Sequence, residues 1–408
     1  MRWIIFIVFY ILISLYAFQA LRTVTKSNWV YAVYVLISVG VLGNFIFHWA
    51  QPDTGQVLTG AKSYAFGFLL ALISAKLVLM LVLFGEDIVR LITGVFKSLW
   101  GSSDKGFYLA SRRDFVSKIA LGIAAIPFAS LLYGMYRGKY NFQVLSYELA
   151  FEDLPEAFDG YQITQISDVH SGSFDNHEKI NYAVNLINEQ QSDAIFFTGD
   201  LVNNRADEME SWKDIFGTLQ AKDGVYSILG NHDYGDYAEW ESDAAKHQNL
   251  QDLKDTQKKM GWDLLLNEHR FIEKNGERIA VVGVENWGAG SFVKHGDADK
   301  AAAGLGANDF KIMLSHDPSY WQEKLKNDPK KYQLTLSGHT HGMQFGIEIP
   351  GWIKWSPVKY RYKNWAGIYQ EFDNYINVNR GFGYLGYPGR VGIWPEISVI
   401  KLKKKRSS

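Results

Sequence analysis

The first third of the chain is organised in long apolar stretches. Residues 3–21 and 28–50 contain no Asp, Glu, Lys or Arg, residues 64–85 contain only Lys76, and residues 119–136 form a fourth apolar stretch. At 1.5 Å per helical residue, each of these stretches is about long enough to cross a hydrocarbon layer of ~30 Å. The pattern predicts a membrane region over residues 1–136 with four transmembrane helices. The alternative is three helices and a cleaved segment over residues 119–136.

After residue 160 the pattern changes to short apolar runs separated by polar stretches. Residues 176–191 and 239–260 have the composition of helices. The predicted strands are 161–167, 194–198, 225–229, 279–284, 311–315, 333–337, 375–379 and 397–402. The alternation predicts an α/β (α+β) domain over residues 161–408, preceded by a connector and first strand over residues 137–160.

The net charge of −1 conceals two oppositely charged parts. Residues 1–135 carry 11 basic and 5 acidic side chains, whereas the remainder carries 31 basic and 38 acidic ones. A basic excess within apolar sequence favours membrane insertion. The acidic remainder lacks the basic track that a long polyanion needs, so no nucleic acid partner is expected. With 47% hydrophobic residues, a disordered chain is excluded.

The basic side chains of the membrane region predict its orientation. They lie in two predicted loops and would face the cytoplasm: Arg22, Lys26, Arg90, Lys97, Lys105, Arg112, Arg113 and Lys118. This predicts a multi-pass protein of the cell inner membrane with its second domain extracytoplasmic, in the periplasm. Residues 111–118 (SRRDFVSK) resemble a twin-arginine export signal. The alternative is an ordinary basic flank of a transmembrane helix.

Lys76 is the one charged side chain within the four predicted helices. An intramembrane cation is often functional. Because the four predicted helices contain no acidic residue, a lysine that packs helices together or extends to the membrane surface is favoured.

Acidic and histidine side chains follow five of the predicted strands. The clusters are 167–170 (SDVH), 199–203 (GDLVN), 230–233 (GNHD), 315–317 (SHD) and 338–342 (GHTHG). Ligands in α/β proteins collect at the carboxyl ends of strands. Since the chain has no cysteine, the available metal ligands are imidazole, carboxylate and amide groups. Together the clusters predict a metal site.

In this order, the five clusters resemble the calcineurin-like metallophosphoesterase superfamily over about residues 141–402. The stretches 154–161 and 380–396 resemble its membrane-associated bacterial branch, which includes phosphodiesterases and the UDP-2,3-diacylglucosamine pyrophosphatases of lipid A biosynthesis. The resemblance implies a two-sheet β sandwich flanked by helices. It also implies hydrolysis of a phosphodiester or pyrophosphate bond by a metal-activated hydroxide, with a lipid-linked substrate as one option.

The resemblance also implies roles for individual residues. Two divalent ions (Mn, Fe or Zn) would be held by the ligands Asp168, His170 and His341 on one side and Asn231, His316 and His339 on the other, with Asp200 bridging. His232 would protonate the leaving oxygen, with Asp233 orienting its ring. Asn203 would contact a ligand. Met343 departs from the family pattern, which usually has a second glycine there, so the adjacent pocket is expected to differ.

Two further features concern the substrate. Arg380 and Arg390 are candidate phosphate contacts, because a guanidinium matches phosphate oxygens, although either could pair with Glu396 instead. Residues 350–370 interleave tryptophan and tyrosine with lysine and arginine. This composition suits either a membrane interface or an ordinary sheet edge.

A second class of function remains open at this stage. The four predicted helices exceed what an anchor requires, so the second domain could be a non-catalytic sensor or regulator of metal or a phosphorylated ligand. A complete set of seven ligands together with His232 favours the enzyme.

Overall fold

The computed structural model describes residues 2–51, 60–99, 110–290 and 292–406. The chain divides into two compact units, with the boundary in the sequence between Tyr136 and Arg137. They are described separately below.

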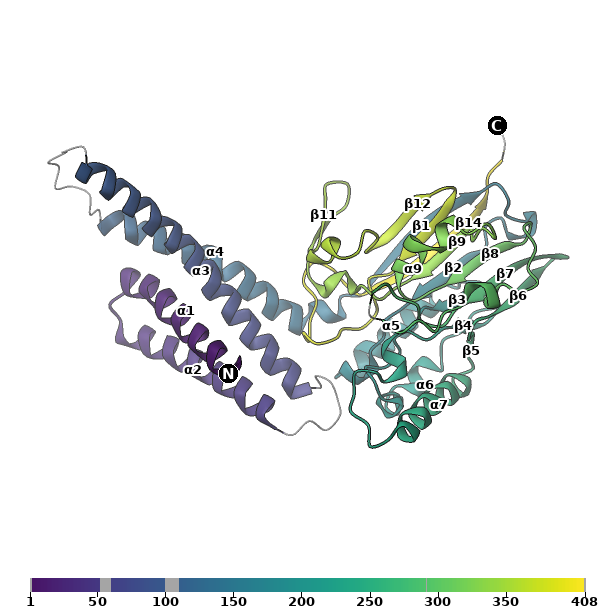
Figure 1. The fold of residues 1–408 in the computed structure, drawn as a ribbon, viewed down its shortest axis with the longest axis horizontal. Coiled ribbons are helices and arrows are strands. Elements are labelled where there is room, and N and C mark those ends of the chain that lie inside the picture. Colours follow the sequence, from purple (N-terminus) through teal and green to yellow (C-terminus); the bar gives the residue numbers. More distant parts are fainter. Residues whose placement is uncertain (1, 52–59, 100–109, 291, 407–408) are drawn as a thin grey trace. The chain divides into compact units, whose positions relative to one another are not determined.

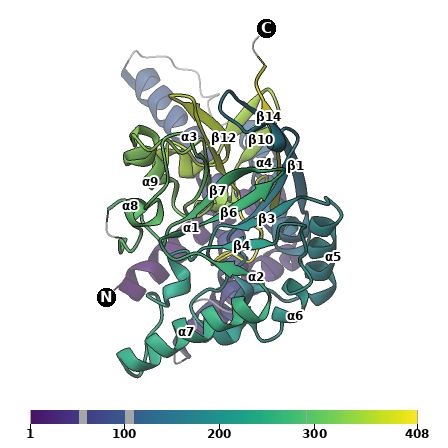
Figure 2. The same ribbon diagram turned by 90° about the vertical axis from the view of Figure 1, so that its right-hand side faces the viewer.

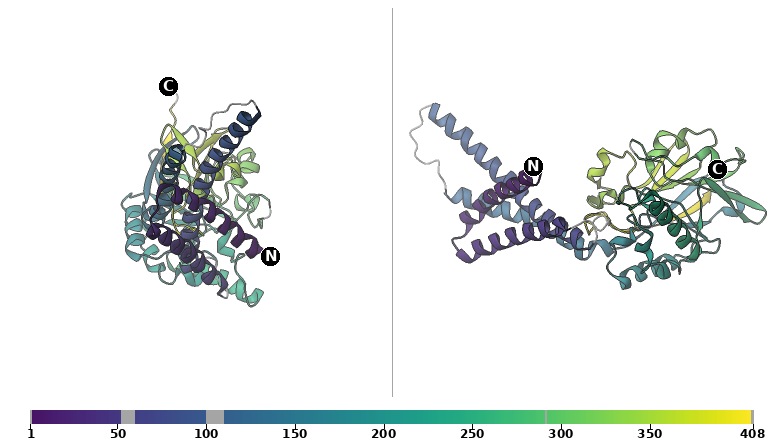
Figure 3. Two further views of the ribbon diagram at one scale, coloured as in Figure 1. Left: turned by 90° about the vertical axis from the view of Figure 1, so that its left-hand side faces the viewer. Right: turned by 60° about the horizontal axis from the view of Figure 1, so that its bottom comes forward.

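The first unit consists of four helices (Figure 3). They are α1 (Arg2–Val24), α2 (Asn28–Ala50), α3 (Gly60–Leu99) and α4 (Ala110–Tyr136), and all four are long and apolar enough to cross a membrane. The four predicted helices are therefore present. Helix α3 has 40 residues and continues well past the predicted end at residue 85, because the charged residues that follow favour helix as strongly as the apolar ones do. Lys105 lies outside the described residues.

Small side chains bring the helices of this unit together. Helices α1, α3 and α4 share a buried cluster of Ala17, Ala20, Leu79, Leu83, Ala120 and Ala124. Alanines at such contacts let helix backbones approach closely, which supports association where the hydrophobic effect between helices is weak.

Lys76 joins three of the helices. Its buried ammonium donates to the Tyr10 hydroxyl at 3.0 Å, to Oγ of Ser14 at 2.8 Å and to Oγ of Ser38 at 3.0 Å. These acceptors belong to α1 and α2, whereas Lys76 belongs to α3. The arrangement supports helix packing, rather than extension to the membrane surface, as the role of this lysine.

Arg113 of the arginine pair links α4 to α3. Its guanidinium donates to Glu86 at 2.8 Å and also to Asp87, whose carboxylate accepts a further hydrogen bond from the Tyr16 hydroxyl at 2.6 Å. One of the two arginines therefore has a structural partner within the helical unit, as expected of an ordinary helix flank. The export signal stays a prediction.

The second unit contains two six-stranded sheets and a separate two-stranded one (Figure 2). The first sheet has the order β1-β14-β2-β3-β4-β5, with β2 to β5 parallel; the second has the order β12-β13-β9-β8-β7-β6, with β13, β9, β8 and β7 parallel. The strands are β1 (Gln143–Phe151), β2 (Gln162–Ile166), β3 (Ala194–Phe197), β4 (Val225–Ser227), β5 (Asp263–Leu264), β6 (Glu268–Lys274), β7 (Glu277–Gly283), β8 (Phe310–Leu314), β9 (Leu334–Ser337), β10 (Ile347–Ile349), β11 (Ile353–Trp355), β12 (Gly367–Glu371), β13 (Asn374–Val378) and β14 (Glu396–Lys404).

Alternating side chains divide the core of this unit into layers. One buried cluster lies between the two large sheets and includes Ile163, Phe196, Ile312 and Leu334. A second packs the opposite face of the first sheet against α5 (His177–Asn188), α6 (Lys213–Phe216) and α7 (Asp243–Lys259); a third packs the second sheet against α8 (Ala298–Ala301) and α9 (Pro318–Glu323). The predicted sandwich of two sheets flanked by helices is confirmed.

The predicted elements lie close to the observed ones. All eight predicted strands are present with ends within two residues, and the two predicted helices correspond to α5 and α7. Strands β5, β6, β10, β11 and β12 were not predicted. Of these, β10 and β11 form the separate two-stranded sheet.

Candidate metal centre

The five predicted clusters come together where strands of the two large sheets end. Asp168 and His170 follow β2, Asp200 follows β3, and Asn231 follows β4, all in the first sheet. His316 follows β8, and His339 and His341 follow β9, in the second sheet. Two groups of candidate ligands result: Asp168 with His170 and His341, and Asp200 with His316 and His339, the ligand atoms of each lying within 4.8 Å of one another.

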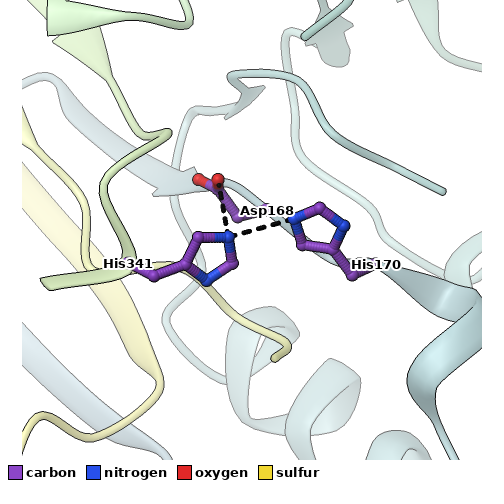
Figure 4. A group of neighbouring side chains, drawn as sticks. All are labelled: Asp168, His170 and His341. Carbon is purple, nitrogen blue, oxygen red and sulfur yellow. Dashed lines mark hydrogen bonds and ion pairs between the residues drawn. The ribbon is translucent and has the colours of Figure 1, made fainter. Parts of the chain in front are cut away.

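In the first group three side chains point at a common place (Figure 4). Nε2 of His341 lies 3.1 Å from Oδ1 of Asp168 and 3.0 Å from Nε2 of His170. Two imidazole nitrogens and a carboxylate oxygen thus face one another; Asp168 and His170 are fully buried, and His341 lies at the accessible side of the group. A cation between them would satisfy all three.

In the second group, hydrogen bonds to the outer atoms of the ligand side chains determine which nitrogen or oxygen atoms face the site. Nδ1 of His316 donates to the carbonyl of Thr198 at 2.7 Å, which directs Nε2 toward Oδ2 of Asp200 at 3.1 Å and Oδ1 of Asn231 at 3.2 Å. The amide nitrogen of Asn231 is held by the Tyr237 hydroxyl at 3.0 Å, so its oxygen faces inward. Acceptor atoms therefore converge, and only a proton or a metal cation can satisfy them.

Asp200 lies between the two groups. Its Oδ2 is 3.1 Å from Nε2 of His316 and 3.6 Å from Nε2 of His170, while Oδ1 accepts a hydrogen bond from the backbone of His232 at 2.8 Å. This is the position that a carboxylate shared by two cations requires. The donor set of nitrogen and oxygen without sulfur fits divalent Mn, Fe or Zn.

The electrostatics of the site favour bound cations. Burial favours neutral carboxyl groups, but the surrounding imidazoles outweigh it and hold the pKa values of Asp168 and Asp200 below the usual range. Burial lowers the pKa of His170 and of His339, so both rings are neutral and can serve as ligands. Burial also disfavours the protonated ring of His316, but the neighbouring Asp200 carboxylate outweighs burial and raises the pKa of His316 to about 10. Positive charge is therefore strongly favoured beside Asp200.

Five of the seven predicted ligands have an unusual backbone. Asp168, His170, Asp200, His339 and His341 have positive φ values between 48° and 70°. Non-glycine residues avoid this left-handed region, and each such residue costs on the order of 1–3 kcal/mol. Strain of this kind concentrates at functional sites. It turns each side chain out of its strand direction and toward the common centre.

Comparison with known proteins agrees with this geometry. Residues 161–343 match the family described as Calcineurin-like phosphoesterase, and residues 1–139 match the family described as Probable Calcineurin-like phosphoesterase, transmembrane domain. The chain belongs to the calcineurin-like metallophosphoesterase superfamily. It combines a four-helix membrane domain with a metal-dependent phosphoesterase domain.

Curated relatives of this metallophosphoesterase are similar over different lengths. An uncharacterized metallophosphoesterase, YkuE of Bacillus subtilis, is 28% identical over 72% of this chain and 98% of its own length. A transmembrane protein with metallophosphoesterase domain from Danio rerio is 28% identical over 67% of this chain and 60% of its own length. An uncharacterized metallophosphoesterase of Helicobacter pylori is 23% identical over 96% of this chain and 94% of its own length.

His232 of the phosphoesterase domain is held beside the ligands. Its Nδ1 donates to the carbonyl of Asn203 at 2.8 Å, and its ring packs against Tyr237 with centroids 4.5 Å apart. Nε2 is left as the nitrogen available for chemistry. His232 lines a cavity of about 600 Å³ together with Asn231, His339 and several aromatic side chains.

The expected role of Asp233 needs correction. Its carboxylate accepts hydrogen bonds from the backbone of Asp200 at 2.9 Å, of Leu201 at 2.8 Å and of Gly230 at 2.8 Å. Asp233 therefore ties the loop after β3 to the loop after β4, and the Asn203 carbonyl orients the His232 ring instead. Sequence proximity suggested the wrong partner because Asp233 is directed back into the loops. Burial raises the pKa of Asp233 to about 7.

The three predicted substrate contacts are all engaged by protein groups. The side chain of Asn203 bonds Ser173. Arg380 binds Glu348 at 2.6 Å and also Glu396, the pairing that was the alternative to a phosphate contact. Arg390 is fully buried, donates to the Gly383 carbonyl at 2.8 Å and lies 3.3 Å behind Nδ1 of His341. Burial lowers the pKa of Arg390 to about 9.

Three further side chains at the site had been given no role of their own. Asp317 and Tyr362 contact the outer nitrogen of His339, and Tyr237 contacts both Asn231 and His232. Asp317 lies in the predicted cluster 315–317 and Tyr362 in the segment 350–370, whereas nothing in the sequence marked Tyr237. The two tyrosines reach the site from loops whose course depends on the tertiary fold.

A second cavity, of about 360 Å³, lies beyond Tyr362. Its charged lining residues are Arg361, Lys363 and Glu323, and Ser319, Gln322 and Asn364 contribute further polar groups. Among the described residues, the lining of the cavity beside His232 has no lysine or arginine; it contains Asp236 together with Tyr234, Tyr237 and Phe292. The two cavities therefore differ in charge.

Proposed function

We propose that the protein is a membrane-anchored phosphoesterase that uses two divalent cations to hydrolyse a phosphodiester or pyrophosphate bond in a lipid-linked substrate. The observation that carries the proposal is Asp200, whose Oδ2 lies within 3.6 Å of an imidazole nitrogen in each ligand group. Two cations held there would supply an acidified water as nucleophile and neutralise the charge of the phosphate oxygens.

His232 would donate a proton to the leaving oxygen. With Nδ1 bound to the Asn203 carbonyl, the ring is fixed in orientation and Nε2 is the atom that can carry the transferred proton. The neighbouring Tyr237 limits the movement of the ring. Asp233 acts by fixing the two loops rather than by touching His232.

The two cavities suggest an asymmetric substrate. The cavity beside His232 is lined by several aromatic side chains and, among the described residues, by no lysine or arginine, which suits the uncharged part of a leaving group. The cavity with Arg361 and Lys363 suits a second anionic group, such as another phosphate.

We further propose that the protein resides in the cell inner membrane with its phosphoesterase domain in the periplasm. The basic side chains near the predicted loops support this orientation. A reporter fused to the C-terminus, active only outside or only inside the cytoplasm, tests it directly. Activity only inside would contradict the periplasmic placement.

The experiment for catalysis uses the full chain in detergent. After chelation, the protein should not hydrolyse bis(p-nitrophenyl) phosphate, and Mn²⁺ should restore the reaction. Full activity of the metal-stripped protein would overturn the proposal. Restoration by Zn²⁺ or Fe²⁺ but not Mn²⁺ would identify another metal without changing the mechanism.

A further inference from the structure

The hairpin formed by β10 and β11 has an inverted pattern of polar and apolar side chains. Ile347 pairs with Trp355, Glu348 with Lys354, and Ile349 with Ile353. The charged pair faces the body of the domain: Glu348 binds the buried Arg380, and the Lys354 ammonium donates to the Ala366 carbonyl. Because side chains alternate along a strand, Ile347 and Ile349 of β10 face outward, while Ile353 and Trp355 of β11 are half-buried.

This outward face leaves large apolar side chains in contact with solvent. Ile347 is 51% exposed, Ile349 is 41% exposed, and Trp352 in the turn is 77% exposed. Phe345 before the hairpin and Tyr360 after it are exposed as well. Figure 1 shows the hairpin, labelled at β11, standing out from the body of the domain. An exposed apolar surface of this kind marks a site that contacts a membrane or another molecule.

The charge around the hairpin selects an anionic partner. Residues 343–365 contain four basic side chains and one acidic one, Glu348, which is already paired with Arg380. Lys359 and Arg361 are exposed. This differs from the acidic excess of the remaining domain. Exposed tryptophan and tyrosine together with lysine and arginine are the composition of a surface that enters the headgroup layer of a bilayer.

The hairpin is fixed to the loop that carries two metal ligands. Oγ of Ser356, just after β11, donates to the carbonyl of Gly342 at 2.8 Å, and Oγ1 of Thr340 donates to the carbonyl of Trp365 at 2.7 Å. Thr340 and Gly342 flank His341. These two hydrogen bonds hold the loop and the hairpin in one arrangement.

We propose that the apolar face of the β10–β11 hairpin inserts into the surface of an anionic lipid bilayer and presents the phosphate of a membrane lipid to the metal centre. The membrane contact stands on the hairpin alone, whereas the presentation of a lipid phosphate rests on the proposed function. A bilayer is favoured over a protein partner because the chain is itself held in a membrane by four helices, so the occupant is always at hand.

The test exploits the absence of cysteine from the chain. A single cysteine replaces Trp352 in the full chain, is labelled with a fluorophore, and the protein is placed in nanodiscs of phosphatidylcholine and phosphatidylglycerol. The matched control is Tyr182→Cys on helix α5, another exposed aromatic position at 59%. We expect quenching of the label at 352 by nitroxide-bearing lipids and shielding from iodide. The label at 182 should show the reverse.

Two outcomes would overturn the membrane contact. One is a label at 352 that iodide reaches as freely as the label at 182. The other is a label shielded from iodide but not quenched by lipid, which means that a protein or a second copy of this chain covers the hairpin. Neither readout depends on activity, so both remain informative if the protein does not hydrolyse bis(p-nitrophenyl) phosphate.

A second experiment addresses presentation of the lipid. The variant has Ile347, Ile349 and Trp352 all replaced by serine. We compare its rate of hydrolysis of a fluorescent phospholipid in nanodiscs with its rate for soluble bis(p-nitrophenyl) phosphate. The ratio of the two rates should fall about tenfold, because membrane-binding strength scales with the buried apolar area. An unchanged ratio would overturn this step. The role of charge is tested by adding Lys359→Gln to the protein that carries the fluorophore at position 352. Quenching of this label by nitroxide-bearing lipids should weaken in nanodiscs that contain phosphatidylglycerol and stay unaltered in pure phosphatidylcholine.

Discussion

Oδ2 of Asp317 lies 3.3 Å from Nε2 of His339, and Nδ1 of the same ring lies 2.8 Å from Oδ1 of Asn231. The imidazole thus has a carboxylate behind it and the proposed metal position in front. The outer nitrogen is hydrogen-bonded to the Tyr362 hydroxyl at 2.8 Å, and the nearby charge of the Asp317 carboxylate strengthens the inner nitrogen as a ligand. Asp317 is therefore a positioning residue for the second cation.

Asp317→Asn should lower metal affinity at this position by about 10–100-fold, the usual cost of losing such a partner. The substitution leaves the helix start intact, because Asp317 also caps α9 through the backbone of Ser319 at 2.8 Å and asparagine caps helices equally well. The measurement is titration of the metal-stripped protein with Mn²⁺.

The matched control for Asp317→Asn is Tyr362→Phe. Its hydroxyl lies 2.8 Å from the same nitrogen of His339 but carries no charge, so the loss of affinity should be smaller. Equal metal affinity in Asp317→Asn and the parent protein would show that the carboxylate does not act on the ligand.

His232→Ala should lower turnover of bis(p-nitrophenyl) phosphate by about 10²–10⁴-fold, the range expected for loss of a positioned acid. Its metal content should stay close to that of the parent protein, because the His232 ring is bonded to a carbonyl rather than to a ligand. Kinetics and elemental analysis of the same preparation separate the two quantities. Asp200→Asn is the contrast and should lose both. Loss of metal in His232→Ala would mean that this ring is a ligand.

Glu208 should give the stability of the domain a pH dependence. Its carboxylate accepts from the backbone of Asn203 and of Asn204, yet burial dominates and raises its pKa to about 7 from the usual 4.5. The folded state then binds a proton more tightly than the unfolded state. The stabilisation is complete below about pH 4.5 and is lost as the pH rises toward 7.

Glu208→Gln should reduce the fall of the unfolding midpoint between pH 4.5 and 7, since the amide oxygen can still accept the backbone hydrogen bonds and Asp233, whose pKa is also about 7, keeps its own contribution. Midpoints come from tryptophan fluorescence of the full chain in detergent across a pH series. The same slope in Glu208→Gln and the parent protein would assign the pH dependence to another group.

In the membrane unit, removing an acceptor of Lys76 should cost more than removing the lysine. The three hydroxyl acceptors satisfy the whole ammonium. Tyr10→Phe would leave a buried cationic N–H without its partner, whereas Lys76→Met would leave only unused hydroxyl lone pairs and remove a desolvated charge. Thermal unfolding of both variants in detergent should therefore rank Tyr10→Phe as the less stable. The opposite order would mean that the charge itself holds the helices.

The elements that could be predicted from the sequence are those whose pattern is local. Strands β3, β8 and β9 are short and fully buried, β2 is buried from Ile163 onward, and each ends at or next to a polar cluster. The ligand positions could be predicted because each follows its strand within a few residues. Strands β10 and β11 were missed because each has only three residues, too few for the apolar/polar alternation to be distinguished from a loop.

Roles that depend on tertiary contacts could not be predicted. Asp233 is next to His232 in sequence but accepts hydrogen bonds from the backbone of the loop after β3. The partner of the His232 ring is a backbone carbonyl, which cannot be recognised from the type of residue that carries it. Likewise Arg380 is paired by Glu348 from the outward hairpin as well as by Glu396. Pairing across loops is decided by how the two sheets pack.

The left-handed backbone of the ligand residues has a consequence for descendants of this domain. While the site is in use, selection must hold Asp168, His170, Asp200, His339 and His341 in a conformation that glycine and asparagine adopt far more readily. Once catalysis is no longer needed, replacing one of the histidines by glycine would relieve backbone strain, whereas Asp168 and Asp200 still accept backbone hydrogen bonds from His339 and His232 that asparagine could keep. A homologue that no longer binds metal should therefore have glycine or asparagine at these positions, so its loss of catalytic function could be recognised from its sequence.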